Sequence, residues 1–206
     1  MSKAAREVMR KVKNAVDDAG GDMNLRLAQL TDKINEHLDT FVKKVNDTDN
    51  FGSSVTTRDR NTKRTYFDPG NRRPVQEEGT ILDDFGSSDR GDNATAIGQL
   101  GIDGDDGGHL GGHRFFGDTP DEGIVPQAAN LNRGAWKKME NEWADWVAEG
   151  CRVDYRISVD PPGAVRPDNF QVAYVVSDPE TGEILETRSP SFENVSGESF
   201  DRINKR

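Results

Sequence analysis

Cysteine, histidine and long apolar runs are scarce in this chain of 206 residues. The single cysteine, Cys151, excludes an intramolecular disulfide framework and a zinc site built from several cysteines. No apolar run approaches the roughly 20 residues that a transmembrane helix needs. The opening run, MSKAAREVMRKVKNAV, is charged and lacks the apolar core of a secretory signal peptide. We therefore expect a soluble protein that, if exported, leaves the cell without a cleavable signal.

Basic residues are also under-represented, with 27 Lys and Arg against 37 Asp and Glu, which gives a formal net charge of -10. This balance argues against a protein that coats nucleic acid or binds anionic membranes, because both use a broadly basic surface. Only 33% of the residues are hydrophobic and 31% are charged, so any core is compact. The length suits one modest domain with an appendage, or two very small domains.

Two helical patterns open the sequence. Apolar residues recur at helical spacing over 3–19, where Gly20-Gly21 ends the pattern, and again over 23–45. We predict a helical hairpin over residues 1–50. A packing or linker module and a membrane-active or partner-binding segment both fit this pattern.

Residues 51–64 are polar and predict a linker, with a basic cluster at Arg58, Arg60, Lys63 and Arg64. The cluster fits a solvated loop or a contact to the DNA backbone. A folded domain is expected over 65–190, followed by a C-terminal tail over 191–206.

The folded domain reads as an α+β protein. Short β-like segments are predicted around 66–67, 75–85 and 95–100, and strands over 151–160 and 169–177, the latter in a hairpin with 184–187. An amphipathic helix is predicted over 134–149. Trp136, Trp143 and Trp146 share one face of this helix. They are expected in the core, with stacking on nucleobases as the alternative.

The chemistry is concentrated in residues 103–140. An Asp-Asp-Gly-Gly-His turn ends at His109, Asn132 follows at the mouth of the predicted helix, and Glu140 lies about two turns further on. A neutral imidazole can take a proton from water near neutral pH. Mg²⁺ prefers oxygen ligands and keeps several waters, so it needs few protein ligands. We also expect Gly107 and Gly108 to let the backbone approach a phosphate. This set favours metal-assisted hydrolysis of phosphodiesters.

Four runs of residues carry a resemblance to a known family. They are Asp105-Asp106-Gly107-Gly108-His109-Leu110, Val125-Pro126-Gln127, Asn130-Leu131-Asn132-Arg133-Gly134-Ala135-Trp136, and Met139-Glu140. They resemble the DNA/RNA non-specific endonucleases of the ββα-metal (His-Me finger) superfamily. The nearest branch is bacterial, and its nuclease domains are toxins of secreted polymorphic effectors, including type VII-secreted ones. The similarity covers roughly residues 65 to 175.

The resemblance implies a ββα-metal finger on an antiparallel sheet. It implies that His109 is the general base, that Asn132 is the single direct metal ligand, and that Glu140 holds the water shell of the metal. The implied cofactor is Mg²⁺, with Mn²⁺ as a substitute, and the implied substrate is DNA, with RNA as a second candidate. A toxin of this branch would act in the cytoplasm of a target cell and would be neutralised by a cognate immunity protein.

One departure from the family concerns the charge that steadies the phosphate. The better-known branch has arginine where this chain has Gly107. Arg114 is the main candidate to replace that charge. Further substrate-binding candidates are Arg72, Arg73 and Arg90, and supporting candidates are Asp106, which would fix the turn or the His109 ring, and Asn130.

Other readings of the same residues are weaker. The spacing of His109 and His113 could suggest zinc, but no partner cysteines accompany them. The acidic run at Asp103 resembles the start of an EF-hand loop but lacks its later ligands. Arg90-Gly91-Asp92 matches an adhesion tripeptide and is better read as a turn. Two rival functions are a nuclease-like protein that binds nucleic acid or a partner without cutting, and a calcium-stabilised adhesin-like module.

Overall fold

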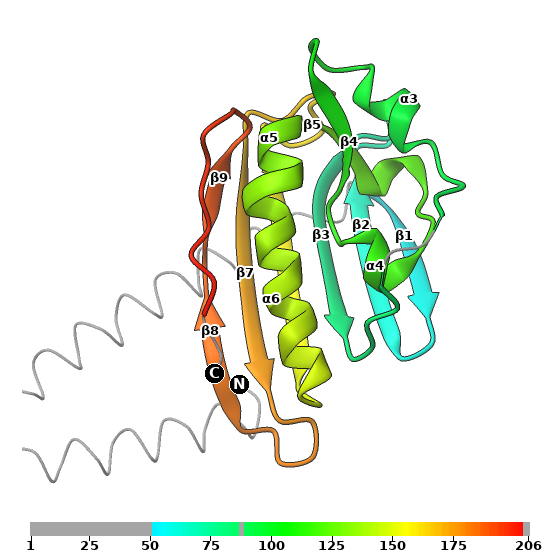
Figure 1. Ribbon diagram of the computed structural model, residues 1–206. Helices are drawn as coiled ribbons and strands as arrows, with labels where there is room; N and C mark the ends of the chain where they lie inside the picture. The colour runs from blue at the N-terminus through cyan, green and yellow to red at the C-terminus, as the bar shows by residue number, and fades with distance from the viewer. Residues whose placement is uncertain (1–50, 87–88, 204–206) are drawn as a thin grey trace, which may run out of the picture. The chain divides into compact units, whose positions relative to one another are not determined.

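The computed structural model describes residues 51–86 and 89–203. The chain divides into two units, Met1–Asp49 and Asn50–Arg206, and the hairpin expected over 1–50 lies outside the described residues. The second unit is an α+β fold in which a long helix lies across one face of an antiparallel sheet (Figure 1). Within the described ranges, no helix is long and apolar enough to cross a membrane.

Among the described residues, the main sheet has seven strands in the order β1-β2-β3-β6-β7-β8, with β9 also paired to β7. Every neighbouring pair is antiparallel. The strands are β1 Gly52–Arg58, β2 Asn61–Phe67, β3 Pro74–Ile81, β6 Arg152–Asp160, β7 Asn169–Ser177, β8 Ile184–Arg188 and β9 Ser191–Glu193. The strands predicted over 151–160 and 169–177, and the hairpin with 184–187, are confirmed.

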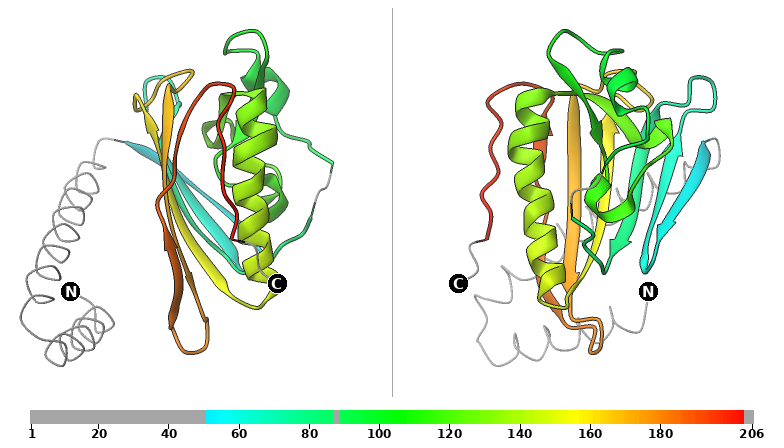
Figure 2. Two further views of the ribbon diagram at one scale, coloured as in Figure 1. Left: turned by 60° about the vertical axis from the view of Figure 1, so that its left-hand side comes forward. Right: turned by 45° about the vertical axis from the view of Figure 1, so that its right-hand side comes forward.

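The long helical segment runs from α5 (Ala129–Leu131) through a π-helical turn (Asn132–Trp136) into α6 (Lys137–Ala148). It covers one face of the sheet (Figure 2). Trp136 and Trp143 are almost fully buried, and the ring of Trp143 stacks on Tyr155 of β6 with centroids 5.1 Å apart. Trp136 and Trp143 therefore lie in the core, as expected, and are not available to stack on bases, while Trp146 is partly buried against that core.

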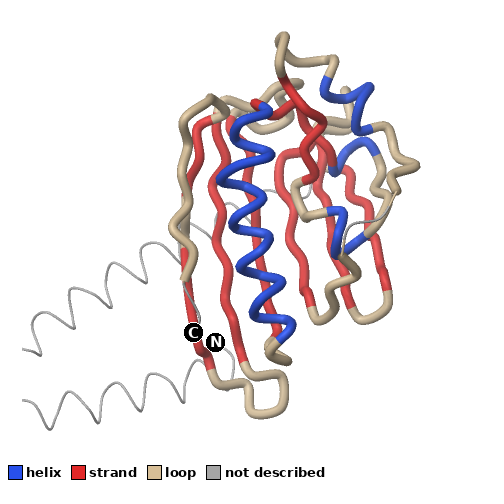
Figure 3. Tube along the Cα trace, viewed as in Figure 1, coloured by secondary structure: helices blue, strands red, loops and turns tan. Residues whose placement is uncertain are grey.

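A smaller two-stranded finger lies above this layer and is built from β4 (Asp105–His109) and β5 (Ile124–Ala128). Their antiparallel register pairs His109 with Ile124. Between the two strands the chain forms α4 (His113–Phe116) and a 3₁₀ turn (Asp121–Gly123), and α3 (Ala94–Gly98) precedes β4. Figure 3 shows these short helices around the finger and the long helix beside it. The finger and the long helix together give the ββα arrangement.

The linker predicted over 51–64 is wrong, because β1 and most of β2 occupy it. Three of the four inward side chains of β2 are polar, namely Asn61, Lys63 and Thr65, so the sequence shows no apolar alternation. Lys63 is buried and forms an ion pair of 3.1 Å with Glu77 of β3, and Thr65 donates a hydrogen bond to the same carboxylate. Paired polar groups can be buried in this way without a large cost.

Two further segments differ from the prediction. Residues 95–100 were expected as a β segment, but α3 covers Ala94–Gly98 because Ala94 and Ile97 bury one helical face against Ile124. The tail predicted from residue 191 is part of the fold as far as it is described. Phe192 in β9 pairs with β7, and both Phe192 and Phe200 are buried in the core.

Candidate active site

One cavity of about 600 Å³ lies where the finger meets the long helix. It gathers side chains from the loop before α3, from β4, from α4 and from the first turns of the long helix. The polar side chains lining it include Arg90, Asp106, His109, His113, Arg114, Asn132, Arg133, Lys137, Glu140 and Asn141. The residues expected as base, metal ligand and acidic partner are thus brought together, with Arg114 and Arg90 beside them.

His109 ends β4 and is only 5% exposed. Its Nε2 lies 2.7 Å from Oδ2 of Asp92. Burial lowers the pKa of His109, the bond to Asp92 opposes this, and the positive charges of Lys63 and Arg90 lower the pKa further. The imidazole is therefore neutral near physiological pH and able to accept a proton.

The sequence suggested that Asp106 fixes either the turn or the ring of His109, but the ring is held by Asp92. Asp106 instead contacts Asn132 and Arg133. Its Oδ2 accepts a hydrogen bond of 3.0 Å from Nδ2 of Asn132, and its two oxygens accept bonds of 2.7 and 2.5 Å from the guanidinium of Arg133.

Asn132 begins the π-helical turn inside a continuous helical segment, so it is not a helix N-cap. Because a carboxylate only accepts hydrogen bonds, Asp106 contacts the amide nitrogen of Asn132 and not its carbonyl oxygen Oδ1. π-helical turns occur often at functional sites, where they change the direction of one side chain.

Glu140 lies two turns further along the helix and faces the loop at Gly112. A Cβ placed on Gly112 would come within 2.7 Å of Oε1 of Glu140, so this glycine leaves room for the carboxylate. Burial raises the pKa of Glu140 to about 7, against the opposing charges of Arg114, Arg90 and Lys137. A carboxyl group with a pKa perturbed in this way, in a cavity that also holds His109 and Asn132, is a candidate functional group.

Arg114 lines the cavity, but its charge is already partly engaged. Its guanidinium donates to both oxygens of Asp84, at 2.8 and 2.6 Å, and to Oδ1 of Asn141 at 2.5 Å. The hydrogen bonds to Asp84 and the charge of this carboxylate raise the pKa of Arg114, and the contacts with Asp84 and Asn141 hold the guanidinium in one orientation. Arg114 is thus a fixed cation at the edge of the cavity.

The other arginines expected to bind substrate, Arg72, Arg73 and Arg90, differ in whether they line the cavity. Arg90 lines the cavity and is exposed. Arg72 donates to both carboxylate oxygens of Glu122 and lies over the ring of Phe67, and Arg73 is only 9% exposed. Neither Arg72 nor Arg73 lines the cavity, so the structure does not support their expected contact with substrate.

Asn130 likewise lies outside the cavity. It lines a neighbouring cavity of about 760 Å³ and accepts a bond of 3.4 Å from the backbone nitrogen of Gly197. The two cavities share Asp105 and Arg133. Asn130 therefore supports the C-terminal segment of the fold and not the cavity that holds His109.

Gly107 lines the cavity, and Gly107 and Gly108 both lie where the chain is tightly packed. A Cβ on Gly107 would lie 1.8 Å from the backbone oxygen of Ala94, and one on Gly108 would lie 2.1 Å from Oε1 of Gln127. Both glycines permit close packing of α3 and β5 against β4. The expected approach of this backbone to a phosphate stays a prediction.

The sequence also raised two alternative metal sites, a zinc site at His109 and His113 and a calcium site at the acidic run that begins at Asp103. The two imidazoles pack edge to face with centroids 5.4 Å apart, and each bonds a different aspartate, His109 to Asp92 and His113 to Asp118. Asp92, His113 and Asp118 do bring three ligand atoms within 4.8 Å of one another. The EF-hand reading fails because Asp105 lies in a strand and is paired with Arg166.

Sequence reasoning missed three residues that organise this site: Asp92, Asp84 and Arg133. Asp92 and Asp84 lie in loops 17 and 30 residues before their partners His109 and Arg114. No spacing rule connects loop residues over such separations. Of the three, only Arg133 carries a signal in the sequence, because it is a charged residue directly after Asn132. In the structure its side chain is 74% exposed.

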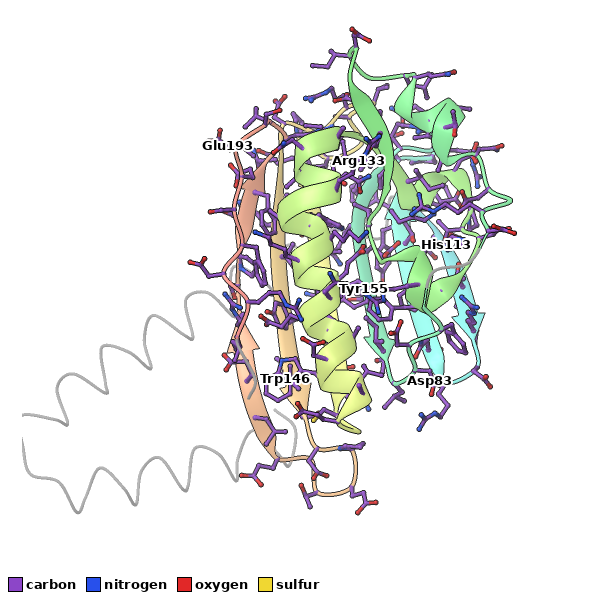
Figure 4. All side chains as sticks on the ribbon, in the orientation of Figure 1. Asp83, His113, Arg133, Trp146, Tyr155 and Glu193 are labelled. Atoms are coloured by element: carbon purple, nitrogen blue, oxygen red, sulfur yellow. The ribbon has the colours of Figure 1, made fainter. Side chains whose placement is uncertain are left out.

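Figure 4 shows His113 on α4 and Arg133 at the upper end of the long helix, with Tyr155 between helix and sheet. The hydroxyl of Tyr155 donates to Glu77 at 2.9 Å, and this carboxylate also pairs with Lys63. Tyr155, Glu77 and Lys63 therefore form a buried polar network in the sheet.

Comparison with known proteins gives a family match and similarity to solved structures, three of which follow. The family described as DNA/RNA non-specific endonuclease matches residues 57–177. An extracellular endonuclease is 19% identical, over 76% of this chain and 85% of its own length, with a TM-score of 0.46. NucA from Streptococcus agalactiae is similar in two crystal structures, each aligned over 71% of this chain and 72% of its own. The magnesium-bound form is 13% identical with a TM-score of 0.48, and the metal-free form is 14% identical with a TM-score of 0.43.

The family match spans more than half of the 206 residues and contains β2 to β7, the finger and the long helix. It includes every side chain placed above as base, metal ligand and acidic partner. The chain therefore belongs to the DNA/RNA non-specific endonuclease family of the ββα-metal superfamily.

Proposed function

We propose that this protein hydrolyses phosphodiester bonds of DNA, and of RNA as a second substrate, with a divalent metal ion, Mg²⁺ or in its place Mn²⁺. The observation that carries the proposal is the meeting of His109, Asn132 and Glu140 in one cavity bordered by Arg90 and Arg114. A base, an oxygen-donor set and fixed cations are the groups that hydrolysis of a phosphodiester requires.

The donor set fits a hard cation. Asn132 offers a carbonyl oxygen because Asp106 holds its amide nitrogen, and Glu140 offers a carboxylate. Oxygen donors that leave most positions to water suit Mg²⁺ or Mn²⁺ better than zinc. When bound there, the cation would supply Lewis-acid stabilisation of the negative charge that develops on the phosphate.

His109 supplies the base. The neutral imidazole takes a proton from a water molecule, whose oxygen forms a bond to phosphorus while the bond from phosphorus to O3′ breaks. The electron pair goes to O3′, which takes a proton from solvent. The products are a 5′-phosphate and a 3′-hydroxyl. The buried, aspartate-bound imidazole is suited to this step because its pKa lies below its usual range.

The negative charge of the phosphate is neutralised by basic residues elsewhere in the chain, because Gly107 stands where the better-known branch has its arginine. Arg114 is held by Asp84 and Asn141 at the edge of the cavity, and Arg90 and Lys137 line the cavity as well. Fixed cations of this kind stabilise the transition state without reorganising during the reaction.

A plasmid-nicking assay tests this proposal. With Mg²⁺ present we expect nicking that EDTA abolishes, a loss of at least about 10²-fold in His109→Ala, and a raised Mg²⁺ requirement in Asn132→Ala. Asn169→Ala, on β7 away from the cavity, is the matched control and should cut like the wild type. Full activity in His109→Ala, or cutting that EDTA leaves unchanged, contradicts the proposal. A folded wild-type protein that binds DNA without cutting it would favour the rival binding function.

We further propose that the protein is the toxin part of a secreted antibacterial effector. It would reach a target-cell cytoplasm without a cleavable signal and be neutralised by an immunity protein. The resemblance of residues 105–140 to that branch supports this role. Expression in a bacterial cytoplasm should stop growth and degrade DNA, and His109→Ala should be harmless at equal protein level. Normal growth with active wild-type protein argues against the toxin role.

A further inference from the structure

The carboxylate of Asp92 is held by three elements at once. Its Oδ2 lies 2.7 Å from Nε2 of His109 and accepts a bond of 3.3 Å from the backbone nitrogen of Thr119. Its Oδ1 accepts a bond of 3.3 Å from the backbone nitrogen of Ala94 at the start of α3. The side chains of Asp92 and His109 are each only 3% exposed. This carboxylate is thus fixed in place and shielded from water.

We propose that Asp92 is the positioning residue that sets the tautomer and orientation of His109, so that Nδ1 is the nitrogen that accepts the proton of water. This assignment rests on the proposed function of the site. A carboxylate only accepts hydrogen bonds, so Nε2 must carry the hydrogen and the lone pair is left on Nδ1. After Nδ1 has taken the proton, the negative charge of Asp92 stabilises the imidazolium.

The loop that carries Asp92 is anchored next to the same ring. The backbone nitrogen of Gly91 donates to Oδ1 of Asp118 at 2.9 Å, and that oxygen also lies 3.1 Å from Nε2 of His113. The ring of His113 packs edge to face on His109. The imidazole of His109 is therefore held on one nitrogen by Asp92 and on one side by His113.

The charges around His109 set the direction of its titration. Asp92 raises the pKa of His109, whereas Lys63 on β2 and Arg90 in the adjoining loop lower it, and His113 on α4 contacts the ring. Removing the negative charge of Asp92 leaves only burial and positive charges acting on the ring. The pKa of His109 must then fall further.

The run Arg90-Gly91-Asp92, which matched an adhesion tripeptide in the sequence, thereby acquires a role inside the site. Arg90 lines the cavity, Gly91 ties the loop to Asp118, and Asp92 bonds the base. A solvent-facing adhesion motif needs an exposed carboxylate, which Asp92 does not offer.

Asp92→Asn tests the assignment, with Asp89→Asn as the matched control. Asp89 lies in the same loop, is exposed, and loses the same charge. In Asp92→Asn we expect kcat for DNA to fall on the order of 10²-fold with KM little changed, since orientation and tautomer act on the chemical step. The acidic limb of the pH profile should move to lower pH, because a base of lower pKa loses its proton earlier. Asp89→Asn should match the wild type in both.

An unchanged kcat and an unchanged acidic limb in folded Asp92→Asn overturn the assignment. A second measurement needs no substitution at Asp92. In the wild-type chain, the ¹⁵N chemical shifts of His109, identified with the help of His37→Gln and His113→Gln, should show a protonated Nε2 and an unprotonated Nδ1 at pH 7. The opposite tautomer also overturns it. Because this readout does not require cleavage, it separates failure of the assignment from failure of the nuclease proposal.

Discussion

Asp106 connects two neighbouring residues of the helix, the amide of Asn132 and the guanidinium of Arg133. The pKa of Asp106 is lowered because these two partners, together with the charge of Arg90, outweigh the effect of its burial. Its carboxylate thus stays ionised and holds the amide nitrogen of Asn132. If Asn132 is the single direct protein ligand, as we propose, its orientation governs metal affinity.

Asp106→Ala should therefore weaken metal binding more than it weakens folding. We expect the Mg²⁺ concentration for half-maximal nicking to rise about 10- to 100-fold, with activity recovered at high Mg²⁺. Asp103→Ala, an exposed aspartate three residues earlier, is the matched control. An unchanged Mg²⁺ requirement in Asp106→Ala would show that Asn132 is oriented by other contacts.

At the scale of the elements, the finger depends on α3 lying directly on β4. Gly98 and Gly107 meet backbone to backbone, since a Cβ on Gly98 would come within 2.5 Å of the nitrogen of Gly107. Ala94, Ile97 and Ile124 form a small core of their own beside this contact. The loop that carries Asp92 leads directly into α3, so this packing also sets where Asp92 meets His109.

Gly107→Ala should destabilise the protein and displace α3. The added methyl group would meet the backbone oxygen of Ala94, which cannot move aside as a flexible side chain can, so we expect a loss of about 2–4 kcal/mol in the free energy of unfolding by urea. Gly134→Ala is the matched control because nothing lies within 4 Å of its Cβ position. There alanine should stabilise the helical segment by about 0.5–1 kcal/mol. Equal effects of the two substitutions would contradict the close contact.

The elements that the sequence predicts are those whose burial is apolar and periodic. The long helix shows Trp136, Met139 and Trp143 at helical spacing, and β6 and β7 alternate apolar and polar residues. The strands within 52–64 are not predicted, because an inward residue of β2 is the charged Lys63. Its partner is the carboxylate of Glu77, which lies on a different strand. No local pattern reveals such a partner.

The residues of the candidate site also fall into those that the sequence reveals and those that it does not. His109, Asn132 and Glu140 are found because their spacing along the chain is characteristic, and the cavity brings them together as expected. Asp92 and Asp84 are not found, since their partners come from distant loops. Long-range charge pairing is a property of the folded chain, so it needs the structure.

At the scale of the whole molecule, an acidic protein presents a locally basic cavity. The net charge is -10, yet Arg90, Arg114, Arg133 and Lys137 line the cavity. Arg114 and Arg133 are already paired with Asp84 and Asp106. Few unpaired cations are therefore left to hold a nucleic acid, and the acidic remainder of the surface repels it.

Substrate binding should accordingly weaken with salt, though only moderately. With about two phosphates neutralised, KM for DNA should rise about tenfold between 50 and 200 mM KCl while kcat stays nearly constant. A small phosphodiester such as bis(p-nitrophenyl) phosphate is the control, because its single charge makes its KM far less sensitive to salt. A KM for DNA that does not change over this range would contradict the proposed contacts.

The hydrogen bond from His109 to a loop outside the finger limits how the site could be transplanted. A segment of residues 105–140 grafted onto another scaffold would carry the proposed base His109, the proposed metal ligand Asn132 and Glu140, but not Asp92 or Asp84. Such a graft would bind metal better than it cuts. The set of residues that the proposed catalysis needs is therefore larger than the sequence motif of residues 105–140. It includes the preceding loops, which carry Asp84 and Asp92.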